Sequence, residues 1–210
     1  MSRSCYNFTT LSSDFVGYEW RGEQLVHVTD GTNEMHFYYD AQNRPAMADF
    51  NGTYYAYLHN LQGDVVGLVD NSNTLVVEYK YDAWGRPTLK RSLTTAYDAL
   101  ATLNPFRYRG YIYDEASGLY YLRSRFYNPV WGRFVNSDNI ISVFRKHTAC
   151  NNLFCYCLNM PIIYYDPSGH SLISMLKNIA YKVGALLGKE EFVQRLFDPL
   201  SPEGTVWREM

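Results

Sequence analysis

Cysteine and histidine side chains are the first candidates for chemistry in this 210-residue chain, because both bind transition metals. Cys150, Cys155 and Cys157 have the spacing C-x4-C-x-C, with His147 nearby and Cys5 far away in the sequence. A structural zinc site or a disulfide framework needs a second close pair of ligands or partners, and this spacing does not supply one. The pattern favours free, buried thiols over a zinc site, so we expect no metal and no cofactor.

Three further histidines lie within or beside stretches that alternate as β-strands do. They are His27, His36 and His59. A single histidine in a strand is more often packed against its neighbours or exposed on the surface than bound to a metal. We therefore interpret all three as packed or surface residues and not as ligands.

Five arginines follow one another at short intervals, and alternating strand positions would arrange them as an exposed stripe between tyrosines. They are Arg107, Arg109, Arg123, Arg125 and Arg133. The net charge of the chain is −2, so it gives no general electrostatic case for nucleic-acid binding. We expect solvated arginines or arginines stacked on aromatic rings, and no nucleic-acid partner.

The composition indicates a globular β protein that is rich in tyrosine. Hydrophobic residues make up 47% and charged residues 19% of the chain, which separates it from disordered proteins. There are 20 tyrosines, and tyrosine suits half-buried strands, where the ring packs and the hydroxyl reaches a polar partner. A tyrosine-lined binding groove remains an open alternative to tyrosines that serve packing alone.

The strands are expected between turns of one repeated form, in which Asp or Asn opens the turn and Gly or Asn follows three positions later. Five such turns lie at residues 30–33, 40–43, 60–63, 70–73 and 82–85. Most begin 10 to 12 residues apart, which is typical of a meander of short strands. The pattern predicts a mainly β fold, a meander of hairpins that forms part of a curled shell or open barrel.

Residues 105–134 read PFRYRGYIYDEASGLYYLRSRFYNPVWGRF and predict consecutive aromatic β-hairpins. Farther on, the Asp-Pro-Ser-Gly sequence at 166–169 predicts a strong turn. Beyond it, apolar residues recur at intervals of three and four between 172 and 187, which predicts an amphipathic helix in a helical C-terminal tail. We expect this helix to dock on the β region, without a membrane span. The first residues lack the apolar core of a signal peptide.

The 105–134 segment, together with YKYDAWGRP at 79–87 and YYDPSGH at 164–170, resembles the RHS or YD-repeat family and is closest to its RHS repeat-associated core. The Tyr-Asp-x-x-Gly-Arg-Pro form of that family is intact at 81–87. It is degraded at 39–45, where Asn43 replaces the glycine. The resemblance implies a wall of β-strands that spirals into a hollow shell.

In that family the shell belongs to bacterial polymorphic toxins and encapsulates a C-terminal effector, and similar shells occur in teneurin adhesion proteins. The resemblance implies a YD-repeat segment at 1–104, a shell-closing core at 105–170 and a tail in the effector position at 171–210. The implied partners are upstream YD repeats, the chain's own effector and an immunity protein, in a parent that is secreted or on the cell surface. The alternative function is a cell-surface adhesion or carbohydrate-binding module without catalysis.

Some members of the family cut themselves at this boundary with an aspartic-protease-like site. By resemblance, the site consists here of Asp138, Asp166 and Arg133, and cleavage follows His170. In such a carboxylate pair, one group holds a proton as the acid while the other activates water as the base. This sequence departs from the family pattern after Asp138 and at His170. The alternatives are a surface aspartate at 138 and a plain turn-opening aspartate at 166.

Overall fold

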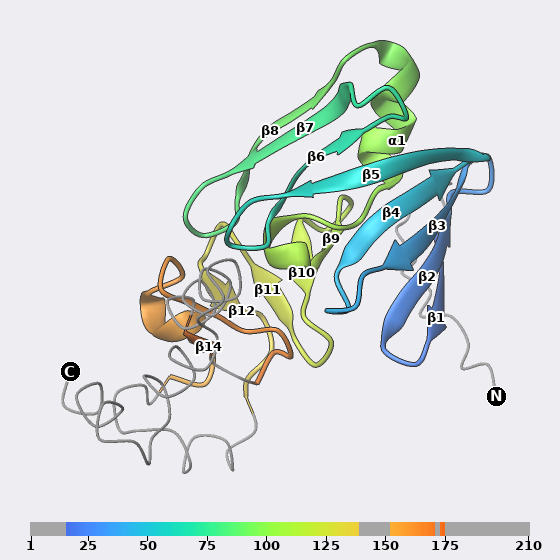
Figure 1. Cartoon of the computed structure of the whole chain (residues 1–210). Helices are drawn as coiled ribbons and strands as arrows, with labels where there is room; N and C mark the ends of the chain where they lie inside the picture. The colour runs from blue at the N-terminus through green and yellow to red at the C-terminus, as the bar shows by residue number, and fades with distance from the viewer. Residues whose placement is uncertain (1–15, 139–151, 171–172, 175–210) are drawn as a thin grey trace.

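The computed structural model of the chain describes residues 16–138, 152–170 and 173–174. Its first part is an eight-stranded antiparallel sheet in which the strands follow one another in chain order. The strands are β1 (Gly17–Arg21), β2 (Gln24–Thr29), β3 (Glu34–Tyr39), β4 (Pro45–Phe50), β5 (Thr53–His59), β6 (Val65–Val69), β7 (Leu75–Tyr81) and β8 (Pro87–Ser92). The sheet curls but does not close, and β1 and β8 are its two edges (Figure 1). The predicted mainly β meander is confirmed.

Four of the five predicted turns share one hydrogen-bond pattern. The side-chain oxygen of the opening residue accepts hydrogen bonds from the backbone amides two and four residues ahead, at 2.8 to 3.0 Å. This occurs at Asp40, Asn60, Asp70 and Asp82. The fourth position of each of these four turns has a positive φ, which Gly and Asn tolerate best. Examples are Asn43 at 64° and Gly85 at 85°. The turn at 30–33 differs, because Asp30 accepts from the amides of Thr32 and Asn33 and the positive φ lies at Gly31.

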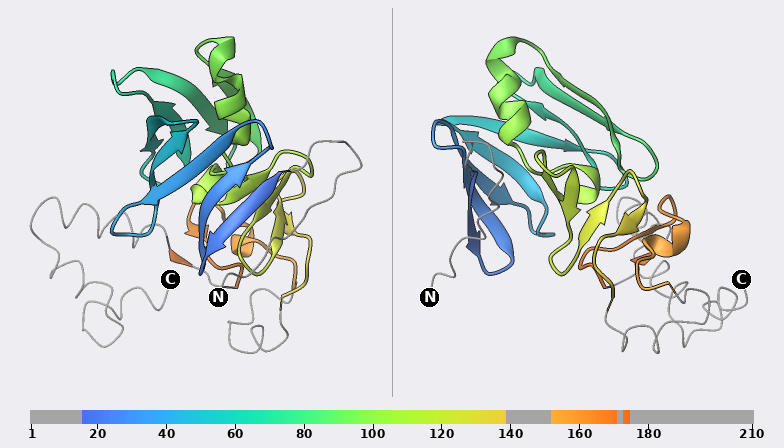
Figure 2. Two further views of the ribbon diagram at one scale, coloured as in Figure 1. Left: turned by 90° about the vertical axis from the view of Figure 1, so that its right-hand side faces the viewer. Right: turned by 180° about the vertical axis from the view of Figure 1, so that it is seen from behind.

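Alternation along each strand separates the two faces of the sheet. In β3, for example, Met35 and Phe37 are buried, while Glu34 and His36 are exposed. The buried face packs against α1 (Asp98–Leu103), a short helix that follows a 3₁₀ turn at Thr95–Tyr97. Each large apolar side chain buried in this way contributes about 1.5 to 3 kcal/mol. Figure 2 shows that the sheet is curved, so that its first strands (blue) and its last strands (green) run in different directions.

The second part consists of short strands that follow α1. Four of them form a small antiparallel sheet: β9 (Ile112–Asp114), β10 (Leu119–Tyr121), β11 (Phe126–Asn128) and β12 (Arg133–Phe134). They confirm the predicted hairpins of residues 105–134. Two further strands pair with each other, β13 (Tyr164–Tyr165) and β14 (Ile173–Ser174), and 3₁₀ turns lie at Tyr108–Gly110 and Cys157–Asn159.

Several sequence predictions lie outside the described residues. They include residues 175–187 of the predicted amphipathic helix and the positions of Cys5, His147 and Cys150. The described residues of that predicted helix, Ile173–Ser174, form strand β14 and not a helix, because their backbone pairs with β13. Of the two cysteines in the described residues, Cys155 is half-buried and Cys157 is buried. Within the described ranges, no helix combines the length and the apolar character that crossing a membrane requires.

Candidate functional site

The second hydrophobic core of the molecule is built mainly from tyrosine side chains. Its buried members are Tyr108, Tyr111, Tyr120, Leu122, Tyr127, Phe134, Tyr156 and Cys157, and we call this set the tyrosine core. Burial of a tyrosine ring is favourable only if the hydroxyl finds a hydrogen-bond partner. Three hydroxyls donate to consecutive carbonyl groups of the β7–β8 turn: Tyr108 to Ala83 at 2.9 Å, Tyr127 to Trp84 at 2.7 Å and Tyr120 to Gly85 at 2.8 Å.

These contacts give a physical reason for the intact YD motif at 81–87. Gly85 has a φ of 85°, and the ring of Tyr108 occupies the space where a side chain at this position would begin. In the β5–β6 turn, Gly63 has a φ of 90° but nothing within 4 Å of that space. Asn43, at the degraded motif, also adopts a positive φ. Among the described turn glycines of the eight-stranded sheet, only Gly85 combines the backbone constraint with such a close ring contact.

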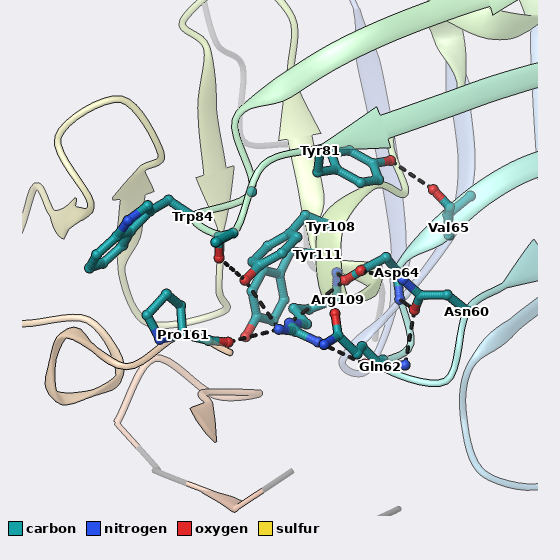
Figure 3. A network of polar contacts seen from close by, with 12 residues as sticks. Asn60, Gln62, Asp64, Val65, Tyr81, Trp84, Tyr108, Arg109, Tyr111 and Pro161 are labelled. Carbon is teal, nitrogen blue, oxygen red and sulfur yellow. Dashed lines mark hydrogen bonds and ion pairs between the residues drawn. The ribbon is translucent and has the colours of Figure 1, made fainter. Parts of the chain in front are cut away.

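Arg109 joins the sheet to the tyrosine core and to the closing segment (Figure 3). Its guanidinium donates to the carbonyl of Pro161 at 2.8 Å and lies 4.7 Å from the centre of the Tyr108 ring. Its backbone amide donates to the buried carboxylate of Asp64 at 2.9 Å, and Asn60 donates to the same carboxylate at 2.6 Å. Burial alone would lower the pKa of the Arg109 guanidinium, but the Tyr108 and Asp64 oxygens outweigh it and raise the pKa.

Arg107 is fully buried beneath β7 and α1. Its guanidinium donates to backbone carbonyls, including that of Ala101 at 2.7 Å, and contacts Glu115 at 3.2 Å. It also stacks on the Tyr79 ring at 4.1 Å. Stacking on rings was expected, but the expected exposed stripe of five arginines is wrong. Three of the five side chains, those of Arg107, Arg109 and Arg125, are buried, and backbone carbonyl groups accept their hydrogen bonds.

Arg125 is the centre of a cluster that contains both predicted aspartates. One of its terminal nitrogens, Nη2, lies 3.4 Å from Oδ2 of Asp138 and 3.5 Å from Oδ2 of Asp166. The other, Nη1, donates to the carbonyl of Leu153 at 3.1 Å, and the guanidinium lies 3.5 Å from the centre of the Phe134 ring. The side chain of Arg125 is only 4% exposed. The structure therefore brings the two carboxylates, 28 residues apart in the sequence, to one nitrogen atom.

The Asp-Pro-Ser-Gly turn at 166–169 is fixed at this cluster on both sides. The carbonyl of Gly169 accepts a hydrogen bond from Nε of Arg125, and the carbonyl of Ser168 accepts one from Ser124 at 2.6 Å. The backbone amide of Asp166 donates to the hydroxyl of Tyr111, a member of the tyrosine core, at 3.1 Å. The turn that closes the described core is thus held in place by the aromatic hairpins.

His170, the residue expected to precede the cut, lies against the same cluster. Its Nδ1 is 2.8 Å from Oδ1 of Asp138. Its backbone amide donates to the hydroxyl of Ser168 at 3.3 Å. His170 is the last residue of this described range and lies one residue beyond Gly169, whose carbonyl Arg125 binds.

Arg133, the predicted arginine of the site, lies on β12 with an exposed side chain, and its backbone forms a bridge with Cys155. The arginine between the two carboxylates is Arg125. Sequence reasoning missed it because no spacing distinguished it among the five arginines. Burial lowers the pKa of the Arg125 guanidinium, whereas Asp138 and Asp166 act in the opposite direction. The cluster can hold two carboxylates side by side because a positive charge lies between them.

One group of side chains in the described part of the chain has a geometry suited to a metal ion. It consists of His27, Glu34 and His36, on β2 and β3. These residues lie on the exposed face of the large sheet.

The comparisons with known proteins agree with the architecture. A family model described as the teneurin YD-shell matches residues 24–162. The chain belongs to the teneurin YD-shell family. Membership confirms the resemblance to YD-repeat proteins on which the sequence interpretation rests.

Relatives of this YD-shell chain include bacterial toxins. The chain is 33% identical over 165 residues to the tRNA3(Ser)-specific nuclease WapA of Bacillus spizizenii, and the match covers 77% of the chain and 7% of that protein. It is 40% identical over 65 residues to the toxin protein Tse5 of Pseudomonas aeruginosa, which covers 31% of the chain and 5% of Tse5. The chain therefore spans less than a tenth of the length of these relatives.

Solved structures share the fold of this YD-shell chain. The Tc holotoxin pore of Photorhabdus luminescens matches with a TM-score of 0.60 and 18% identity, over 82% of the chain and 8% of the matched protein. The crystal structure of TcdB2-TccC3-TEV matches with a TM-score of 0.57 and 20% identity, over 75% and 8% respectively. The chain is thus a segment of a YD-repeat shell of the kind found in toxin proteins.

Proposed function

We propose that this chain is the closing part of a YD-repeat shell that encapsulates a C-terminal effector in a secreted or cell-surface bacterial protein. The observation that carries the proposal is that residues 166–169, which precede the tail, are held in place by contacts with the aromatic hairpins. The tyrosine core binds the β7–β8 turn on one side, and on the other it holds residues 166–169 through Arg125, Ser124 and Tyr111. Residues 1–104 are then wall, 105–170 closing core, and 171–210 the tail that enters the effector position.

The concave side of the molecule offers space that a shell interior requires. A cavity of about 1520 Å³ lies between the sheet and the core hairpins, lined in part by Trp20, Tyr39, Phe106 and Tyr121. Aromatic walls with polar groups among them suit contact with a folded or unfolded polypeptide. In the full shell this surface would face the enclosed effector.

The edge strand β1 supports upstream YD repeats as a partner. Within the described residues β1 pairs with β2 alone, so its outer backbone groups are open to a further strand. A preceding repeat would continue the meander at this edge. An immunity protein for the effector remains a prediction from the family.

We also propose self-cleavage between His170 and Ser171 by the two carboxylates that meet at Arg125. One carboxylate takes a proton from water as the oxygen adds to the carbonyl carbon of His170. The other, protonated, gives its proton to the leaving nitrogen of Ser171 as the C–N bond breaks. Support comes from the placement of Asp138 beside His170 and of Asp166 at the start of the fixed turn. Arg125 lies beside both carboxylates and compensates their charge, whereas the resemblance names Arg133 as the nearby arginine.

Intact mass spectrometry of the full chain tests the cleavage. The expected result is a mixture or full conversion to species ending at His170, with Asp138→Asn and Asp166→Asn remaining full-length. Arg133→Gln is the matched control and should cut like the unaltered chain, because its side chain is exposed and lies on β12. A full-length product that stays uncut at pH 5 and pH 7 would refute self-cleavage.

Encapsulation has its own test in the natural full-length protein. The region after residue 170 should resist added protease as long as the shell is folded, and it should become sensitive when the shell is opened by denaturant. Equal sensitivity of the effector region in both states would refute encapsulation. That result would leave the outcome of the cleavage assay unaffected.

A further inference from the structure

Strand register places four side chains of metal-ligating type in one row on the exposed face of the sheet. Glu19 pairs with His27, His27 with His36, and His36 with Asp49, across β1 to β4. Glu34 lies two residues before His36 and therefore points to the same face. Residues 8 to 13 positions apart in the sequence thus become direct neighbours. The sequence alone gave no sign of this, because each histidine is isolated within its own strand.

The two imidazoles and one carboxylate of this row converge. The rings of His27 and His36 stack at 4.4 Å between centroids, with 20° between their planes. Nε2 of His27 lies 3.9 Å from the carboxylate of Glu34. One ligand atom from each of His27, Glu34 and His36 lies within 4.8 Å of the other two.

The polar atoms of His27 are arranged as in a metal-binding histidine. Its Nε2 is buried and has no hydrogen-bond partner among the described residues, although it is directed towards Glu34. Its Nδ1 lies 3.8 Å from the carboxylate of Glu19. In protein metal sites, a ligating histidine directs its second nitrogen to a carboxylate or carbonyl, which orients the ring. A metal ion would supply the partner that Nε2 lacks.

We propose that His27, Glu34 and His36 bind a Zn²⁺-class divalent transition-metal ion, which links β2 to β3 on the outer face of the sheet. Imidazole with one carboxylate suits Zn²⁺, Ni²⁺ or Cu²⁺, whereas Mg²⁺ and Ca²⁺ prefer sites made of oxygen ligands. Three protein ligands leave the fourth tetrahedral position to water or to a group from a partner.

The ligand atoms need to move only a short distance to bind a zinc ion. Tetrahedral ligands at zinc-to-nitrogen distances lie about 3.3 Å apart, so the three ligand atoms must approach by roughly one ångström. Glu34 and His36 are exposed, and their side chains change rotamer without disturbing the core. The backbone positions are set by the paired strands.

Isothermal titration calorimetry of ZnCl₂ into the full chain at pH 7.5 tests this site. We expect binding that weakens at least tenfold in His36→Gln and in Glu34→Gln, and no comparable heat from MgCl₂ or CaCl₂. The matched control is His59→Gln, which removes a histidine of the same sheet outside the cluster and should keep the affinity within twofold. Equal Zn²⁺ affinity in His36→Gln and the unaltered chain would overturn the proposal.

Two further measurements separate this site from the cysteines and from misfolding. In the Co²⁺-loaded chain, the visible spectrum should lack the thiolate charge-transfer bands that cysteine ligation produces, and their presence would also overturn the proposal. Glu34→His supplies a third imidazole and should tighten Ni²⁺ binding at least tenfold. A gain of affinity cannot come from loss of folding, so an unchanged or lower affinity in this variant counts against the site.

Discussion

The eight-stranded sheet and the tyrosine core are both antiparallel β structures, but they satisfy their polar groups in opposite ways. In the sheet, four of the turns are closed by their own opening side chain over four residues, as at Asp40 and Asp82. In the tyrosine core the strands are two or three residues long, and the bonds that hold them come from far along the chain. The Arg125 side chain contacts groups 9 to 44 residues away.

The two regions therefore place different constraints on their amino-acid sequences. A locally closed hairpin needs an Asx residue and a residue that tolerates positive φ, so the YD motif can degrade at 39–45 without loss of the turn. The tyrosine core needs particular side chains, because each one completes a contact that another segment begins. For that reason, the amino-acid sequence of residues 105–134 tolerates less variation than the sequence of the hairpin turns.

Of the substitutions that compare the two regions, removal of the Arg125 side chain should lower the free energy of unfolding the most. Arg125→Ala leaves the carboxylates of Asp138 and Asp166 without the guanidinium between them, and loss of one partner from a buried ion cluster costs about 3 to 5 kcal/mol. Urea denaturation measures the loss in free energy of unfolding. The control is Arg91→Ala, whose ion pair with Glu78 is exposed, and it should cost at most about 1 kcal/mol. Similar losses in the two variants would remove the distinction between the regions.

Glycine substitutions at two turns compare the regions directly. Gly85→Ala meets both a positive φ and the Tyr108 ring, and these should together destabilise the fold by about 2 to 5 kcal/mol. Gly63→Ala meets only the positive φ, so about 1 to 2 kcal/mol is expected. Thermal and urea unfolding of the two variants give the difference. If Gly63→Ala proved the more harmful, the β7–β8 turn would not be the special docking point.

Alkaline pH should weaken the tyrosine core. Burial raises the pKa of Tyr108 to about 12, and burial raises the pKa of Tyr120 and Tyr127 as well. An unfolded tyrosine titrates near pH 10, so above that pH the unfolded chain loses protons that the folded chain keeps. The stability that these groups contribute is therefore complete below pH 10 and falls as the pH rises towards 12, by roughly 1 to 3 kcal/mol for Tyr108.

Unfolding curves at pH 9, 10 and 11 measure how steeply the free energy of unfolding falls with pH. Tyr127→Phe removes one of the titrating hydroxyls, so its stability should fall less steeply over the same pH range. A free energy of unfolding that stays constant from pH 9 to pH 11 would contradict burial of these hydroxyls.

Single hydroxyl deletions should have the smallest effects. Tyr120→Phe leaves the carbonyl of Gly85 without the 2.8 Å hydrogen bond, at a cost of about 1 to 2 kcal/mol. Tyr54→Phe, on the exposed face of β5, should stay within about 0.5 kcal/mol of the unaltered chain. Differential scanning calorimetry resolves the two as a difference in melting temperature. Equal melting temperatures would mean that the hydroxyl bonds to the β7–β8 turn add nothing to stability.

Much of the sheet could be predicted because its information is local. The Asx turns, the strand alternation and the hairpins of 105–134 all depend on residues a few positions apart, and the structure confirms them. Asp138 and Asp166 could be selected only through the family resemblance. The arginine that lies beside both carboxylates is Arg125 and not the expected Arg133, and nothing in the local sequence distinguishes the two.

The sequence by itself determined the β meander, its turns and the family, since backbone conformation at a turn follows from two or three residues. Only the tertiary structure decided which arginine lies between the carboxylates, which turn the tyrosine core binds, and which histidines meet. Those contacts join segments tens of residues apart, and strand register together with burial selects them. A one-residue slip between β2 and β3 would turn His27 and His36 to opposite faces, although the sequence would be unchanged.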